Sequence, residues 1–172
     1  MFKMIGIILI LLSGTLAGFH KARQFAARPR QIREMILALQ RLETEITYGL
    51  TPLPDAMAKM AEQAKEPLRT VWSSASRWMS PLMRLSAQES IQRALNDNWK
   101  RTAMRSSEKE ILHQLSYTLG TSDRQDQIKH IALAAQQLKH EEASAREDQI
   151  KYEKISKSLG LLIGALIVIL IF

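Results

Sequence analysis

The chain has 172 residues, a formal net charge of +7 and no cysteine. Without cysteine, a disulfide framework, a thiolate metal site and a cysteine nucleophile are all excluded. The length predicts one domain with a single modest hydrophobic core.

Both ends of the chain are apolar, and basic residues lie just inside each end. Residues 4–19 and 158–172 carry no charged side chain. The cations that flank these stretches are Lys21, Arg23, Arg28, Arg30, Arg33, Lys151, Lys154 and Lys157. Because lysine and arginine beside a membrane span stay in the cytoplasm, we expect transmembrane helices at residues 1–20 and 158–172 and a cytoplasmic domain at residues 21–157.

Each apolar stretch also has an alternative interpretation. Both are short for a membrane span, which needs about 20 residues, although flanking lysines can reach back toward the lipid headgroups. A cleaved signal peptide is the alternative at the N-terminus, because Lys3, an apolar run and small residues fit its outline. A buried core helix is the alternative at the C-terminus, where the sequence is apolar on every helical face.

A long amphipathic helix is expected after the first apolar stretch. Pro29 suits the first turn of this helix. Apolar residues then recur at three- and four-residue spacing from Ile32 to Ile46, and Gly49 marks the end of the pattern.

The prolines of the next segment predict a corner and two further helices. Thr51–Asp55 is expected to form a tight turn that leads into a short second helix. Pro67 opens a third helix, whose apolar face runs from Leu68 to Leu82, and Pro81 is expected to end or kink it.

Capping motifs mark the remaining three helices. Ser86–Glu89 is a capping box that predicts the start of a fourth helix, and Ser107–Glu110 predicts the start of a fifth. Gly120 is expected to end the fifth helix in a left-handed conformation. Ser122 or Asp123 caps a sixth helix, which can continue unbroken into the membrane.

These elements predict an all-α fold without strands. The short connections favour antiparallel neighbours. We therefore expect a six-helix antiparallel bundle flanked by an N-terminal and a C-terminal transmembrane helix.

The sequence contains no pattern typical of a catalytic, cofactor or metal site. None of the four histidines has a second ligand at the spacing of a helical metal site. Glu43 and Glu45 lie on different faces of a helix, which makes a poor acid–base pair. The glycines are scattered singly, and the few aromatic residues offer no stacking platform for nucleic acid. We expect a non-enzymatic protein that binds no cofactor, metal or nucleic acid.

Five segments together resemble the stage III sporulation protein AB family. These segments are Arg28–Arg33, Leu39–Ile46, Tyr48–Leu53, Leu119–Asp123 and Lys157–Gly160. The resemblance covers essentially the full chain, and the order of the segments, the chain length and the anchor at each end also match the family.

The resemblance implies a part in a large assembly. Members of the family belong to the channel complex that connects mother cell and forespore, and their soluble domain is similar to the six-helix module of type II secretion and type IV pilus platform proteins. By analogy, the chain would lie in the mother-cell membrane around the forespore, with its soluble domain facing the mother-cell cytoplasm. It would link the AA secretion-type ATPase of the stage III sporulation A operon to the operon's channel proteins. Platform proteins usually carry two modules and three spans, so their symmetry and mechanism do not transfer directly.

The resembling segments supply the candidate interaction residues. They are Arg28, Arg30, Gln31, Arg33, Glu43, Tyr48, Gly49, Thr51 and Pro52. The arginines are expected to bind anionic lipid headgroups or acidic side chains of a partner, or only to fix the cytoplasmic orientation. The corner around Tyr48, Gly49 and Pro52 is expected to be structural and is the second candidate for docking.

A GxxxG spacing occurs in each apolar stretch, at Gly14 and Gly18 and at Gly160 and Gly164. Such pairs permit close helix contact, which is compatible with a homo-oligomer. Two other classes of function stay open: a membrane-anchored adaptor outside sporulation, and a lipid-binding or pore-forming protein.

Overall fold

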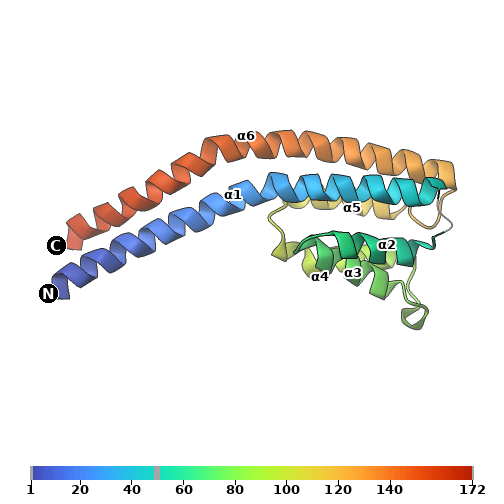
Figure 1. Ribbon diagram of the computed structural model, residues 1–172, viewed down its shortest axis with the longest axis horizontal. Helices are drawn as coiled ribbons and strands as arrows, with labels where there is room; N and C mark the ends of the chain where they lie inside the picture. The colour runs from blue at the N-terminus through green and yellow to red at the C-terminus, as the bar shows by residue number, and fades with distance from the viewer. Residues whose placement is uncertain (1, 49–50, 172) are drawn as a thin grey trace. The chain divides into compact units, whose positions relative to one another are not determined.

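The computed structural model describes residues 2–48 and 51–171. These residues form six α-helices and two short 3-10 helices, with no strand among them (Figure 1). The α-helices are α1 (Phe2–Tyr48), α2 (Leu53–Gln63), α3 (Leu68–Trp78), α4 (Ala87–Asn98), α5 (Ser106–Ser116) and α6 (Arg124–Ile171); the 3-10 helices are η1 (Pro81–Met83) and η2 (Trp99–Arg101). The predicted all-α fold is confirmed for this part of the chain.

The chain divides into two compact units. The end unit combines α1 up to Pro29 with α6 from Ala143 onward, and the bundle unit is Arg30–Glu142. In the end unit, the rings of Phe25 on α1 and Tyr152 on α6 stack with their centroids 5.5 Å apart.

The prediction that Pro29 opens the first helix is wrong. Pro29 lies inside α1, which begins at Phe2. A proline removes one backbone donor from a helix interior, and the helical residues on both sides keep α1 continuous through it. The two apolar ends therefore belong to the first and sixth helices and do not add separate flanking helices.

No helix in the described part of the chain combines the length and the apolar composition needed to cross a membrane. The two predicted glycine pairs, Gly14 with Gly18 and Gly160 with Gly164, lie outside the residues whose packing the structure describes.

The core of the bundle unit is built from one face of each helix. Within this unit, α2 packs against α3, α3 against α4, and α4 against α5. The fully buried large side chains include Ile32, Met35, Leu39 and Leu42 on α1, Met57 on α2, Leu68 and Val71 on α3, Leu95 on α4, and Ile131 and Leu138 on α6. Their three- and four-residue spacing is the periodicity expected of helices that bury one side.

The predicted capping box at the start of α4 is confirmed. The Ser86 hydroxyl accepts a hydrogen bond from the Glu89 backbone N–H at 3.1 Å, and the Glu89 carboxylate accepts one from the Ser86 backbone N–H at 2.9 Å. The Ser86 backbone N–H, and after it the Ser86 hydroxyl, which donates to Oε2 of Glu89 at 2.8 Å, hold the pKa of Glu89 below its ordinary value. The box satisfies two backbone donors that the helix cannot satisfy internally.

The predicted capping box at Ser107–Glu110 is wrong. Helix α5 begins at Ser106, and the Glu108 carboxylate accepts a 2.7 Å hydrogen bond from the Arg105 backbone N–H. An arginine side chain has no acceptor, so only the glutamate half of a box forms at this helix. The serine and glutamate pattern marked the right region but the wrong pair of residues.

The left-handed conformation predicted for Gly120 and the predicted cap of α6 are confirmed, but α5 ends earlier than expected, at Ser116, so Gly120 lies in the turn that follows the helix. Gly120 has a φ of 82°, in the left-handed region. The Asp123 carboxylate then accepts a 2.9 Å hydrogen bond from the Asp126 backbone N–H, which caps α6.

Candidate interaction surfaces

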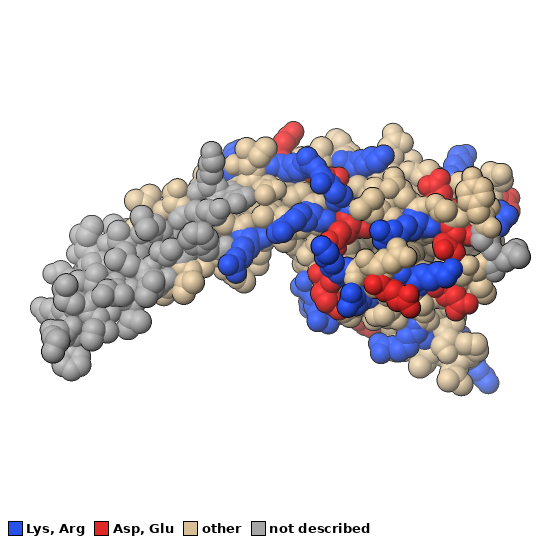
Figure 2. All heavy atoms as spheres, in the orientation of Figure 1, with Lys and Arg blue, Asp and Glu red and all other residues tan. Residues whose placement is uncertain are grey.

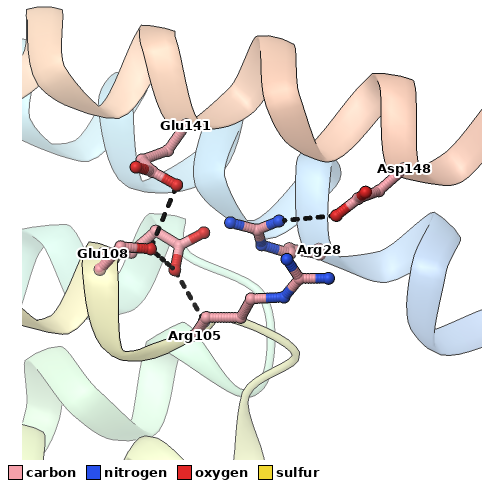
Figure 3. Close-up of polar contacts among 6 residues, drawn as sticks. Arg28, Arg105, Glu108, Glu141 and Asp148 are labelled. Carbon is pink, nitrogen blue, oxygen red and sulfur yellow. Dashed lines mark hydrogen bonds and ion pairs between the residues drawn. The ribbon is translucent and has the colours of Figure 1, made fainter.

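The residues of the segment Arg28–Arg33, called the basic run below, have different surroundings in the structure. Arg28 is only 5% exposed, and its Nη1 lies 3.3 Å from Oδ2 of Asp148 on α6 (Figure 3). This arginine therefore has a structural partner inside the end unit. The side-chain oxygen of Gln31 accepts a 2.7 Å hydrogen bond from the Ala103 backbone N–H, which ties α1 to the loop before α5.

Two arginines of the run reach the surface of the bundle unit. Arg30 is exposed. The Arg33 side chain is 54% exposed, and its Nε and Nη2 donate to Oε1 of Glu142 at 3.0 and 2.7 Å. Only the arginine end of this pair is exposed, since the Glu142 side chain is 15% exposed. The outward-facing guanidinium of Arg33 is the part of the pair that an acidic group of a partner can reach.

The corner between α1 and α2 is exposed and polar. Tyr48 is 85% exposed, and Pro52, also exposed, accepts hydrogen bonds from the Asp55 and Ala56 backbone N–H groups at 3.0 Å each. Glu43 is half-buried, and its backbone carbonyl accepts from the Thr47 hydroxyl at 2.7 Å. Gly49 lies outside the described residues.

A polar cluster secures this corner. The Thr51 hydroxyl donates to Oε2 of Glu45 at 2.9 Å, and the Lys59 ammonium lies 3.2 Å from the same oxygen. The Thr51 hydrogen bond, followed by the Lys59 hydrogen bond, lowers the pKa of Glu45. Sequence reasoning named Thr51 but missed Glu45 and Lys59, because they become neighbours only when α2 folds back beside α1.

A pocket of about 170 Å³ lies beside this cluster. Its lining includes Arg41, Thr44 and Glu45 from α1 and Lys59, Met60 and Gln63 from α2. The corner therefore offers a shallow depression lined by charged, polar and apolar side chains.

A groove between α5 and α6 was not predicted. Two neighbouring hollows of about 580 and 210 Å³ share Ile111, Leu133 and Gln137 in their lining, with His130 and His140 also present. Leu133 is 49% exposed. The sequence carries one indication that Leu133 is exposed: it lies two residues from the buried Ile131 and therefore on a different face of the helix.

A buried glutamate lies at the start of α5. Glu108 is 0% exposed, and its Oε2 accepts from the Arg105 backbone N–H (Figure 3). The Ser107 hydroxyl lies 3.2 Å from Oε2 of Glu108 and 3.1 Å from Oε2 of Glu141, and its one proton can serve only one carboxylate at a time. This arrangement fixes the N-terminus of α5 against α6 and provides no reactive group.

The described residues of the bundle unit present a mixed surface of basic and acidic side chains (Figure 2). No group of three His, Cys, Asp or Glu side chains among the described residues could hold a metal ion. The pKa of His113 is lowered mainly by burial, with Lys109 adding to the effect. The features with a shape and chemistry suited to recognition are thus the α1–α2 corner and the α5–α6 groove.

Comparison with known proteins places the chain in one family. The family model for stage III sporulation protein AB matches residues 3–172. Stage III sporulation protein AB of Bacillus subtilis (strain 168) is 40% identical over 171 residues, which cover 99% of each chain. A solved structure of stage III sporulation protein AB (SpoIIIAB), also 40% identical, superposes with a TM-score of 0.69 over 73% of this chain and 98% of that one. The chain therefore belongs to the stage III sporulation protein AB family.

Proposed function

We propose that this protein is a non-enzymatic, membrane-anchored platform subunit of the channel between mother cell and forespore, and that it is required for endospore formation. The observation that carries the proposal is the family match along nearly the whole chain, residues 3–172. In this role the bundle unit couples the operon's AA secretion-type ATPase to the membrane channel proteins.

Membrane anchoring is supported by the composition of both ends. Residues 4–19 and 158–172 are uncharged, and all the cations beside them except Lys3 lie on their inner sides. Phe25 stacks on Tyr152, and the Lys151 ammonium lies 5.2 Å from the Tyr152 ring centroid. Aromatic rings beside lysine are typical of the boundary between lipid and water. In the proposed arrangement, residues 1–20 and 158–172 are the anchors and the bundle unit lies in the mother-cell cytoplasm.

The α1–α2 corner is the proposed docking site for the ATPase. Tyr48 supplies a large exposed ring, and tyrosine is enriched at the energetic centres of protein interfaces. The Glu45, Thr51 and Lys59 cluster joins α1 to α2, which reduces the conformational entropy that these residues lose when a partner binds. Arg30 and Arg33 add exposed positive charge on the same helix.

Deletion of the gene in the bacterium that encodes it tests the proposed function. Vegetative growth should be unchanged, and spore formation should stop after the forespore is engulfed. Normal sporulation of the deletion strain would contradict the proposal.

Complementation of this strain with charge-reversal variants tests the basic surface. Arg30→Glu combined with Arg33→Glu should restore far fewer heat-resistant spores than Arg101→Glu, a matched change at another exposed arginine. Arg28 is not part of this comparison because it is buried in an ion pair. Equal spore counts for the two strains would remove Arg30 and Arg33 as a special surface.

A further inference from the structure

The connection between α3 and α4 carries exposed apolar side chains. It contains η1, Pro81–Met83, followed by Arg84. Leu82 is 89% exposed and Met83 is 44% exposed. Leu82 is thus more exposed than any other large apolar side chain among the described residues. Leu82 and Met83 are adjacent and both exposed, so their side chains contribute little to the core.

The segment that carries this tip is positively charged. Residues 67–88 contain Arg69, Arg77 and Arg84 and no aspartate, glutamate or lysine, and Arg93 follows on α4. Among the residues that the structure describes, no ion pair involves Arg77, Arg84 or Arg93. The following acid in the chain, Glu89, has its carboxylate bound to Ser86. In Figure 2 the protruding end of this connection is blue and tan.

Two of the arginines, Arg77 and Arg93, lie over one aromatic ring. The Arg93 guanidinium carbon lies 4.1 Å from the centroid of the Trp78 ring, and that of Arg77 lies 5.8 Å from it. Stacking on an indole leaves the edge of a guanidinium free to donate hydrogen bonds. Arg84 has a φ of 51°, a left-handed conformation that non-glycine residues rarely adopt, and it turns the chain sharply after Met83.

We propose that the arginine tip, defined as Leu82 and Met83 with the exposed Arg77, Arg84 and Arg93 that flank them in the chain, docks into an acidic-rimmed apolar pocket of a protein partner. Leu82 fills the pocket, and the guanidiniums bind carboxylates on its rim. The proposal adds a second surface to the proposed function, separate in the chain from the α1–α2 corner.

Charge complementarity and side-chain type favour a protein as the occupant. All cations of residues 67–88 are arginines, which match carboxylates in a bidentate geometry that lysine lacks. Tryptophan and arginine are the residues most enriched at interface hot spots. A lipid surface would gain little from two apolar side chains and does not require guanidiniums fixed on a ring.

Photocrosslinking of the full-length protein in sporulating cells tests the proposal. The photoreactive amino acid p-benzoylphenylalanine replaces Leu82, which is too exposed for the change to affect folding. The matched control carries it at Tyr117, which is 57% exposed on another part of the same unit. The captured peptide is identified by mass spectrometry. Arg84→Glu and Arg77→Glu are each combined with the Leu82 probe, and a thermal unfolding curve checks that both variants fold.

The proposal predicts a protein adduct at Leu82 and not at Tyr117, on a peptide flanked by aspartate or glutamate. Arg84→Glu should lower the adduct yield at least about tenfold, because an attractive charge pair becomes a repulsive one. Reversal of an acidic residue in the captured segment to lysine should restore the yield. Three results would each overturn the proposal. They are an adduct yield at Leu82 no higher than at Tyr117, an adduct to lipid, and a yield that neither the arginine reversal nor the acidic reversal changes.

The same experiment separates this surface from the proposed function. Capture of a channel subunit on an acidic segment supports both. Capture of an acidic segment of a protein unrelated to sporulation supports the docking tip and contradicts the proposed function. Normal sporulation of the deletion strain contradicts only the proposed function.

Discussion

Arg28 on α1 and Asp148 on α6 form an ion pair with 3.3 Å between Nη1 and Oδ2, and the arginine side chain is 6% exposed. A buried cation that loses its partner is costly, whereas an exposed arginine on a lipid headgroup contributes little to folding. The sequence predicted the same role for Arg28 and Arg30, whereas in the structure Arg28 is buried and Arg30 is exposed.

Replacement of Asp148 should therefore destabilise the protein. Asp148→Ala leaves the Arg28 charge buried and should lower the free energy of unfolding of the full chain in detergent by about 3 kcal/mol. Replacing the exposed Arg30 by alanine should change it by less than about 1 kcal/mol. Denaturant unfolding measures both, and equal small effects would show that the pair does not hold the two helices together.

Glu108 should matter more than Glu110, although the sequence pattern favoured Glu110. Glu108→Ala removes the acceptor of the Arg105 backbone N–H and should cost about 2 kcal/mol of unfolding free energy. Glu110→Ala, at an exposed position in the same helix, is the matched control and should cost well under 1 kcal/mol, or about the usual effect of a surface change. A larger loss of stability from Glu110→Ala than from Glu108→Ala would instead support the capping box predicted at Ser107–Glu110.

Gly120 should not tolerate a side chain. A Cβ there would lie 2.8 Å from the Cβ of Ala87, and the φ of 82° is strained for any other residue. Gly120→Ala should therefore lower the free energy of unfolding by at least about 1 kcal/mol from the backbone conformation alone. Adding Ala87→Gly should recover the steric part of the loss. If the two changes were simply additive, the close approach of the two residues would be disproved.

The contribution of the Ser86–Glu89 box should depend on pH. Because the folded protein lowers the pKa of Glu89, the stabilisation is fully present above the ordinary value of 4.5 and is lost as the pH falls through the lower folded pKa. Glu89→Gln should therefore destabilise the protein at pH 7 and have a much smaller effect in acid, measured by thermal unfolding across the pH range. Ser86→Ala should weaken this pH dependence, and a Glu89→Gln effect that is constant with pH would contradict the assignment.

Local sequence signals predicted most of the helices because their causes are local. The Ser86 cap, the left-handed Gly120 and the Asp123 cap each depend on residues within one turn of the helix. Pro29 was misplaced for the same reason: the local preference of proline for a first turn is real, but it does not outweigh a helix that is favoured on both sides.

The candidate surfaces were only partly predictable. Tyr48 and Pro52 are exposed, as a corner requires. The role of Gln31 in binding Ala103, and the burial of Arg28, depend on contacts with residues far away in the chain. The α5–α6 groove and the tip at Leu82 likewise exist only once the helices are packed, since an apolar residue in a sequence does not reveal whether it faces the core.

The most direct test of the platform role is photocrosslinking in sporulating cells with p-benzoylphenylalanine at Tyr48, whose side chain is 85% exposed. The proposed function predicts an adduct with the AA secretion-type ATPase or another channel subunit of the operon. Recovery of lipid alone, or of no adduct at all, would contradict a docking role for the α1–α2 corner and with it the proposed link between the ATPase and the membrane.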